Sequence, residues 1–316
     1  MPNWNDVLNE IKKTKSKEGQ SPLDLVRRKY LARLAKTTGR NVIAYYSAFL
    51  SKPNVAGTEI NDDDKNGLML CIHELKREAG LDLILHTAGG TVAAAESFVH
   101  YLKQMFGNDV RAIVPQICMS AGTLIACSCK EILMGKHSNL GPVDPQLDGF
   151  PALAVTEQFD EAFKQIVADA RAADAWQPIL QHLGPSLLKE CEWAIDRSKG
   201  FLIDVLKQNM LASDPNPAVK AEEIQKKLMD VASSGGHDRH FHFNDCIGMG
   251  LAIKMIEDDP SLQDDILTVH HCFMHTTSNS AAVKIIENHL GRALLKNETA
   301  TLPQLSIGFA PPPPAP

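Results

Sequence analysis

The residue in this sequence best suited to nucleophilic chemistry is Ser120, in the turn Met119-Ser120-Ala121-Gly122. The apolar run at residues 110–114, which Pro115 ends, predicts a short buried strand before the turn, and residues 123–129 predict a helix after it. Such a turn exposes the hydroxyl, and the first amides of the helix are unpaired donors for an oxyanion. Because the turn lacks the first glycine of a G-x-S-x-G elbow, a serine that only caps a helix is the alternative.

A second turn of small residues lies upstream, at Thr87-Ala88-Gly89-Gly90-Thr91. Residues 83–86 predict a buried strand before it, and apolar residues spaced over 92–102 predict a helix after it. The two glycines permit backbone geometry closed to other residues and can leave an amide facing a ligand, although an ordinary strand-to-helix turn is the alternative. Because adjacent parallel strands end at one edge of a sheet, the two turns together predict a shared site.

Three motifs in this order resemble those of the serine dehydrogenase proteinase family, within the Clp protease and crotonase superfamily. They are His86-Thr87-Ala88-Gly89-Gly90, Met119-Ser120-Ala121-Gly122-Thr123 and Leu140-Gly141-Pro142-Val143-Asp144-Pro145-Gln146. The resemblance extends over residues 30–295, and signal peptide peptidase A is a near relative in the same group. It implies an α/β fold of the Clp protease/crotonase type, which is a ββα superhelix with a mostly parallel sheet, here with helical N-terminal and C-terminal additions.

The resemblance also implies a reaction. Ser120 would attack a peptide carbonyl to form an acyl-enzyme, and the amides of Gly90 and Ala121 would hold the oxyanion, as the glycine-loop and post-serine amides do in the superfamily. The superfamily further implies assembly into a homo-oligomer, with a peptide or protein as substrate and with no cofactor or metal.

The general base is the open part of this assignment. Asp144 lies close to where the Clp protease pattern places its histidine, and His237 lies nearer that pattern's acidic position, so the two residue types are exchanged. We favour His237 as base with Asp144 as the orienting acid, because histidine titrates near neutral pH whereas an unperturbed aspartate is a poor acceptor from a hydroxyl. The alternatives are Asp144 itself, His240, and Lys164, since signal peptide peptidase A uses a lysine.

The elements that must position these residues alternate along the chain. Strands are expected at residues 41–50, 81–85, 110–114 and 131–134 with helices between them, which predicts a mostly parallel sheet. Residues 150–210 have a helical pattern, 244–256 resemble the family's small helix and final strand, and 281–295 resemble an amphipathic helix. The expected domains are an N-terminal helical segment at 1–40, a catalytic domain at 41–260, a C-terminal helical extension at 261–305 and a Pro-rich tail at 306–316.

Composition and residue spacing give no support for a nucleic-acid-binding, membrane-spanning or metal-binding protein. The chain has 316 residues and a net charge of −6, which gives no support for a nucleic-acid partner. The seven cysteines form no C-x-x-C pair, as expected of reduced thiols in a cytoplasmic protein. No signal peptide or membrane-spanning run is evident. The acidic run Asp62-Asp63-Asp64 is better explained by the positive end of a following helix than by a metal, and the histidines at 270, 271 and 275 match no standard zinc spacing.

The sequence therefore predicts a cytoplasmic serine endopeptidase. Two alternatives come from other functional classes. A crotonase-type enzyme would use the same two amides to polarise the carbonyl of an acyl-CoA thioester, with Asp144 as acid or base. A catalytically silent scaffold would keep the fold and bind peptides.

Overall fold

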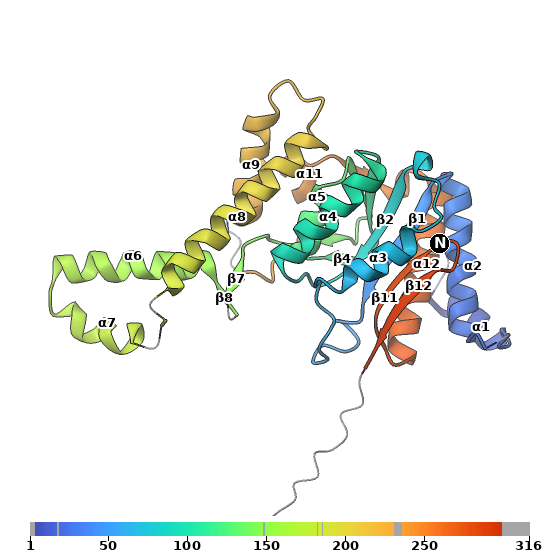
Figure 1. Cartoon of the computed structure of the whole chain (residues 1–316), viewed down its shortest axis with the longest axis horizontal. Helices are drawn as coiled ribbons and strands as arrows, with labels where there is room; N and C mark the ends of the chain where they lie inside the picture. Colours follow the sequence, from blue (N-terminus) through green and yellow to red (C-terminus); the bar gives the residue numbers. More distant parts are fainter. Residues whose placement is uncertain are drawn as a thin grey trace, which may run out of the picture.

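The computed structural model describes residues 4–17, 19–147, 149–181, 183–184, 186–230 and 236–298; the tail expected at 306–316 lies outside them. A seven-stranded sheet of order β10-β5-β3-β2-β1-β11-β12 forms the centre (Figure 1). Its strands are β1 (Asn41–Ser47), β2 (Leu81–His86), β3 (Val110–Val114), β5 (Glu131–Met134), β10 (Ile253–Met255), β11 (Ala282–Asn288) and β12 (Ala293–Asn297). From β10 to β1 neighbouring strands are parallel, and β11 is antiparallel to β1 and β12. This mostly parallel sheet confirms the predicted α/β class.

Helices cover both faces of the sheet, which explains why all of β1 is buried. Ile43 and Tyr45 of β1 belong to the larger core, together with residues of α3 (Asp64–Ile72), α4 (Val92–Phe106) and α5 (Ala121–Cys127). Ala44 and Tyr46 point to the opposite face, because side chains alternate along a strand. The helices α2 (Pro22–Thr38) and α12 (Pro260–Asn279) pack there.

The elements around Ser120 form a ββα unit of the kind expected for the predicted superhelix. β3 is followed by the short strand β4 (Ile117–Cys118) and then by α5. β4 pairs in parallel with β6 (Asn139–Leu140), which pairs with β9 (Phe241–His242) in a small second sheet. Single bridges join Thr87 to Cys118 and Ile60 to Gly90. Backbone pairing therefore holds the loops that follow β1, β2, β3 and β5 next to one another, beyond the carboxyl edge of the main sheet.

An arm of helices projects from this core (Figure 1). It consists of α6 (Ala152–Ala168), α7 (Ala172–Leu180) and the beginning of α8 (Leu187–Gln208), and no residue of α7 is buried. The remaining elements are α1 (Trp4–Lys13), α9 (Pro217–Met229), α11 (Phe243–Met249), the 3₁₀ turns η1 (Arg77–Ala79) and η2 (Ile256–Asp258), and the hairpin β7 (Gln146–Leu147) and β8 (Phe150–Pro151). In the described part of the chain no helix has the length and apolarity needed to cross a bilayer.

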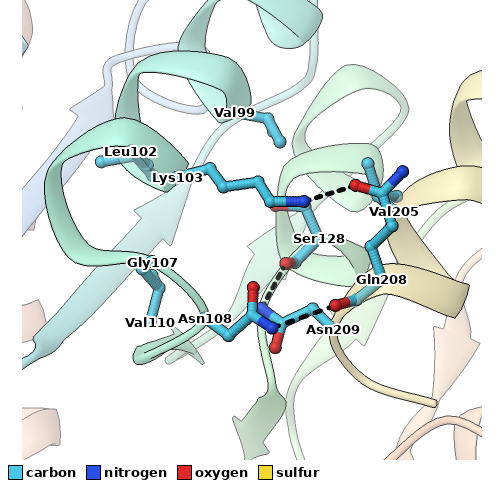
Figure 2. Close-up of a pocket in the computed structure, with 10 residues that line it drawn as sticks. All are labelled: Val99, Leu102, Lys103, Gly107, Asn108, Val110, Ser128, Val205, Gln208 and Asn209. Atoms are coloured by element: carbon cyan, nitrogen blue, oxygen red, sulfur yellow. Dashed lines mark hydrogen bonds between the residues drawn. The ribbon is translucent and has the colours of Figure 1, made fainter. Parts of the chain in front are cut away.

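The carboxyl end of α8 is fixed to the core (Figure 2). Lys103 of α4 donates to the Gln208 side chain, Asn108 donates to the Gln208 carbonyl at 3.1 Å, and Asn209 donates to the Ser128 carbonyl at 2.9 Å. The cavity between these side chains measures about 30 Å³, which suits a water molecule rather than a substrate. This junction thus anchors the one arm helix that reaches back over the sheet.

The amphipathic helix expected at residues 281–295 is wrong, because this segment forms the hairpin of β11 and β12. Every residue of β11 is buried between its neighbours, including Lys284 and Glu287, which are paired with buried charges. These two polar residues break the strand-like alternation and leave apolar spacing that also fits a helix. The β-branched residues Val283, Ile285 and Ile286 were the better signal. The domain boundaries stay predictions.

Acid sensitivity is expected from His86, which ends β2 and is fully buried against Tyr46 and Phe49. Burial lowers the pKa of His86 to about 3, whereas a histidine in the unfolded chain has a pKa near 6.5. Between these pKa values the unfolded state binds a proton that the folded state does not. The contribution of neutral His86 to the unfolding free energy is therefore fully present above pH 6.5 and is lost as the pH falls toward 3. From pH 7 to pH 5 the wild type should lose roughly 2 kcal/mol more unfolding free energy than His86→Phe in urea titrations. Equal losses in the two proteins would contradict this origin.

Candidate active site

Ser120 occupies a strained elbow between β4 and α5. Its φ of 50° and ψ of −119° are unusual for a residue other than glycine, and such backbone strain costs about 1–3 kcal/mol and gathers at functional sites. The turn is tied down on both sides, since Gly122 donates to the Met119 carbonyl at 2.8 Å and the Thr123 hydroxyl donates to the Cys118 carbonyl at 3.0 Å. The capping alternative fails, because the Ser120 side chain makes no capping hydrogen bond.

The glycine loop lies directly against this elbow. A Cβ on Gly89 would lie 2.6 Å from the Cβ of Ser120, so only glycine allows the approach. On the other side of the loop, Ile60 donates to the Gly89 carbonyl at 2.7 Å and accepts from the Thr91 amide at 3.0 Å. Successive amides along an extended segment point in opposite directions. The amide of Gly90 therefore points away from Ile60.

Two amides next to Ser120 are thus left as donors. Neither the Gly90 amide nor the Ala121 amide donates to another group among the described residues. Ala121 is the first residue of α5, where an amide has no partner within the helix. Such a pair is what an oxyanion hole needs, because both donors are fixed in place before any charge develops.

Asp144 and His237 are brought together although they lie far apart in the sequence. The Asp144 carboxylate is buried, and its Oδ1 lies 2.6 Å from Nδ1 of His237. Its Oδ2 accepts from the Gln146 side chain at 3.1 Å. With Nδ1 turned to the carboxylate, Nε2 is the nitrogen of His237 that remains for a serine hydroxyl. Among the described residues, Ser120 and His237 are not hydrogen-bonded to each other; such bonds are often long before substrate binds.

The pairing of β4 with β6 explains how Asp144 reaches the serine. Cys118 pairs with Leu140, and the Gly141 amide donates to the Thr123 hydroxyl at 3.1 Å, so the loop carrying Asp144 starts beside the Ser120 turn. Ser120, Asp144 and Gly90 line one cavity of about 480 Å³. This volume accommodates several side chains of a peptide. The cavity wall is mostly apolar and includes Val92, Leu124, Val143, Leu147 and Trp193.

Two of the alternative bases, Lys164 and His240, are not brought to this cavity. Lys164 is an exposed residue of α6 in the arm, and His240 is exposed beside β9. Neither of them lines the cavity, and neither does His237, which is joined to the cavity wall through its bond to Asp144. No group of three or more His, Cys, Asp or Glu side chains in the described part of the chain is arranged to hold a metal ion.

Sequence reasoning missed the contribution of α8 to the site. Trp193, Ala194, Arg197 and Ser198 form one side of the cavity. Trp193 is 61% exposed although it lines the cavity. No local signal marks these residues, since only the course of α8 back over the core brings them to Ser120.

Comparison with known proteins agrees with the motifs. The family described as ClpP-like SDH-type serine proteinase matches residues 17–256. Uncharacterized protein MJ0137 of Methanocaldococcus jannaschii is 28% identical over 227 residues, covering 72% of this chain and 70% of the relative. Uncharacterized protein MJ1495 of the same organism is 30% identical over 169 residues, covering 54% of this chain and 51% of the relative. Among solved structures, a ClpP1 mutant from Listeria monocytogenes is similar with a TM-score of 0.40 and 13% identity, covering 73% of this chain and 99% of that chain.

Proposed function

Since the chain belongs to the ClpP-like SDH-type serine proteinase family, we propose that it is a serine endopeptidase that hydrolyses peptide bonds through an acyl-enzyme on Ser120. The observation that carries the proposal is the convergence on one cavity of three groups: the strained Ser120, the Gly90 amide and the carboxylate of the Asp144–His237 pair. That amide donates to no group in the part of the chain that the structure describes. A peptidase needs a nucleophile, an oxyanion site and a base, and each of these has a candidate here.

The proposed reaction follows from these roles. Nε2 of His237 takes the proton of the Ser120 hydroxyl as the oxygen attacks the substrate carbonyl. The amides of Gly90 and Ala121 hold the oxyanion, and Asp144 stabilises the imidazolium through Nδ1. The imidazolium then gives its proton to the departing amine, which leaves the acyl-enzyme. Water, deprotonated by His237, attacks the ester carbonyl and releases the second product and the free serine.

The setting of the enzyme is part of the proposal. All seven cysteines are buried free thiols, which supports a reducing compartment and hence a cytoplasmic enzyme. The arm exposes Phe163, Val167 and Ile179, which supports assembly into a homo-oligomer. A peptide or an unfolded protein segment is the proposed substrate.

The test is intact-mass analysis after treatment with a fluorophosphonate probe. The folded wild type should gain one adduct, and Ser120→Ala should gain none. Ser128→Ala is the matched control at the opposite end of α5, and it should be labelled like the wild type. A folded wild type that takes no adduct would contradict the proposal, and saturable binding of an acyl-CoA by that protein would favour the thioester enzyme.

A further inference from the structure

Ile60 holds the backbone on both sides of the Gly90 amide. The Ile60 amide and carbonyl hold the Gly89 carbonyl and the Thr91 amide, on either side of Gly90. A Cβ on Gly90 would lie 2.2 Å from the Ile60 carbonyl oxygen, so the two backbones are in direct contact. Any displacement of Ile60 therefore rotates or shifts the proposed oxyanion donor.

Ile60 is held in turn through both of its chain neighbours. The Lys284 ammonium donates to the Glu59 carbonyl at 2.6 Å, and the Asn61 amide donates to Oδ2 of Asp64 at 3.1 Å. Lys284 and Asp64 also bind each other, with Nζ 2.7 Å from Oδ1. The two members of the ion pair therefore hydrogen-bond the backbone of the residues immediately before and after Ile60.

This ion pair is built into the core. The side chains of Lys284 on β11 and Asp64 at the start of α3 are 1% and 0% exposed. The Tyr45 hydroxyl of β1 donates to Asp64 at 2.8 Å, and Lys296 of β12 lies 3.2 Å from the same carboxylate. Burial lowers the pKa of Lys284, while Asp64 opposes that change. A buried ion pair is weak evidence for stability, because apolar residues of similar volume often stabilise a fold as well or better.

We propose that Lys284 and Asp64 are positioning residues for the oxyanion site, acting through Ile60 on the amide of Gly90. The inference rests on the proposed peptidase function. It assigns a catalytic consequence to an acidic run that the sequence explained only by the positive end of a helix. Neither residue lines the cavity beside Ser120, so their effect reaches the reaction only through the backbone.

The test compares Lys284→Met with Arg27→Met. Arg27 forms an equally buried ion pair with Glu287, another residue of β11. Its other polar partners among the described residues are Thr276 and Asp24, and not residues 59–61. Both variants should lose stability in thermal melts. At a temperature where both remain folded, Lys284→Met should show a kcat about 10-fold lower with KM unchanged, a fraction of the 10²–10³-fold cost of removing an oxyanion donor. Arg27→Met should keep the wild-type kcat. Equal kcat values in the two folded variants would overturn the inference.

If Lys284→Met does not fold, Tyr45→Phe and Tyr46→Phe decide the question. They are adjacent, fully buried tyrosines of β1 whose hydroxyls bond Asp64 and His270, respectively. Tyr45→Phe should lower kcat several-fold at constant KM, and Tyr46→Phe should not. Equal kcat values for these variants would again overturn the inference. A wild type that neither hydrolyses peptides nor takes a fluorophosphonate adduct refutes instead the peptidase function on which the inference rests.

Discussion

Asp144→Asn is expected to lower kcat for peptide hydrolysis by about 10⁴-fold, the scale found when the orienting acid of a serine triad becomes an amide. The carboxylate accepts from Nδ1 of His237 at 2.6 Å, and this bond selects the tautomer whose Nε2 can take a proton. An asparagine amide in the same place can donate to Nδ1 and select the opposite tautomer. The measurement is single-turnover acylation with a chromogenic peptide ester, together with fluorophosphonate labelling.

Two further variants sharpen that result. His237→Ala should lose activity to a similar extent, because the two residues act as one unit. Gln146→Leu removes only the second contact to Asp144, at 3.1 Å, and should cost less than 10-fold. If His237→Ala retained acylation while Asp144→Asn did not, the carboxylate itself would be the base and the proposed roles would be wrong.

Gly90→Ala has the second largest expected effect, a fall in kcat of roughly 10²–10³-fold. The new Cβ would lie 2.2 Å from the Ile60 carbonyl oxygen and 2.4 Å from its amide nitrogen, so the loop must move and carry the oxyanion amide with it. Overpacking of this kind also costs about 1–3 kcal/mol of stability. Steady-state kinetics and thermal melts measure the two effects separately.

Gly248→Ala is the control for that substitution. Gly248 lies in α11, and in the described part of the chain its added Cβ would meet no atom of another element within 4 Å. Its alanine variant should therefore keep full activity. Wild-type kcat in Gly90→Ala would show that this amide does not hold the oxyanion.

The parts of the site that come from local sequence were predictable. The apolar strands, the small-residue turns and the helices after them follow from patterns within about 20 residues. The strands at 110–114 and 131–134 have the expected bounds, and Ser120 lies in the expected turn. The exchanged order of Asp144 and His237 came from the family resemblance, and the structure does pair these two side chains.

The parts that depend on distant contacts were not predictable. The sequence places Lys284 in an expected amphipathic helix and explains Asp64 by the positive end of another helix. The two residues meet in the core only because β11 pairs with β1. The wall formed by α8 has the same cause, because nothing near Trp193 in the sequence refers to Ser120. Long-range partners of buried charges leave no periodic pattern in a single chain.

The helix α8 joins the core to the projecting arm. Its carboxyl end is fixed by Asn209 and Gln208, and its other end belongs to the projecting arm. At about 1.5 Å per residue, Trp193 lies roughly 22 Å from the fixed end and Ser198 roughly 15 Å from it. Arg197, between these two residues, donates to Glu96 of α4 at 2.9 Å. The part of α8 that lines the cavity is therefore tied to the core as well, and the position of this wall relative to Ser120 depends on the packing of α8 against α4.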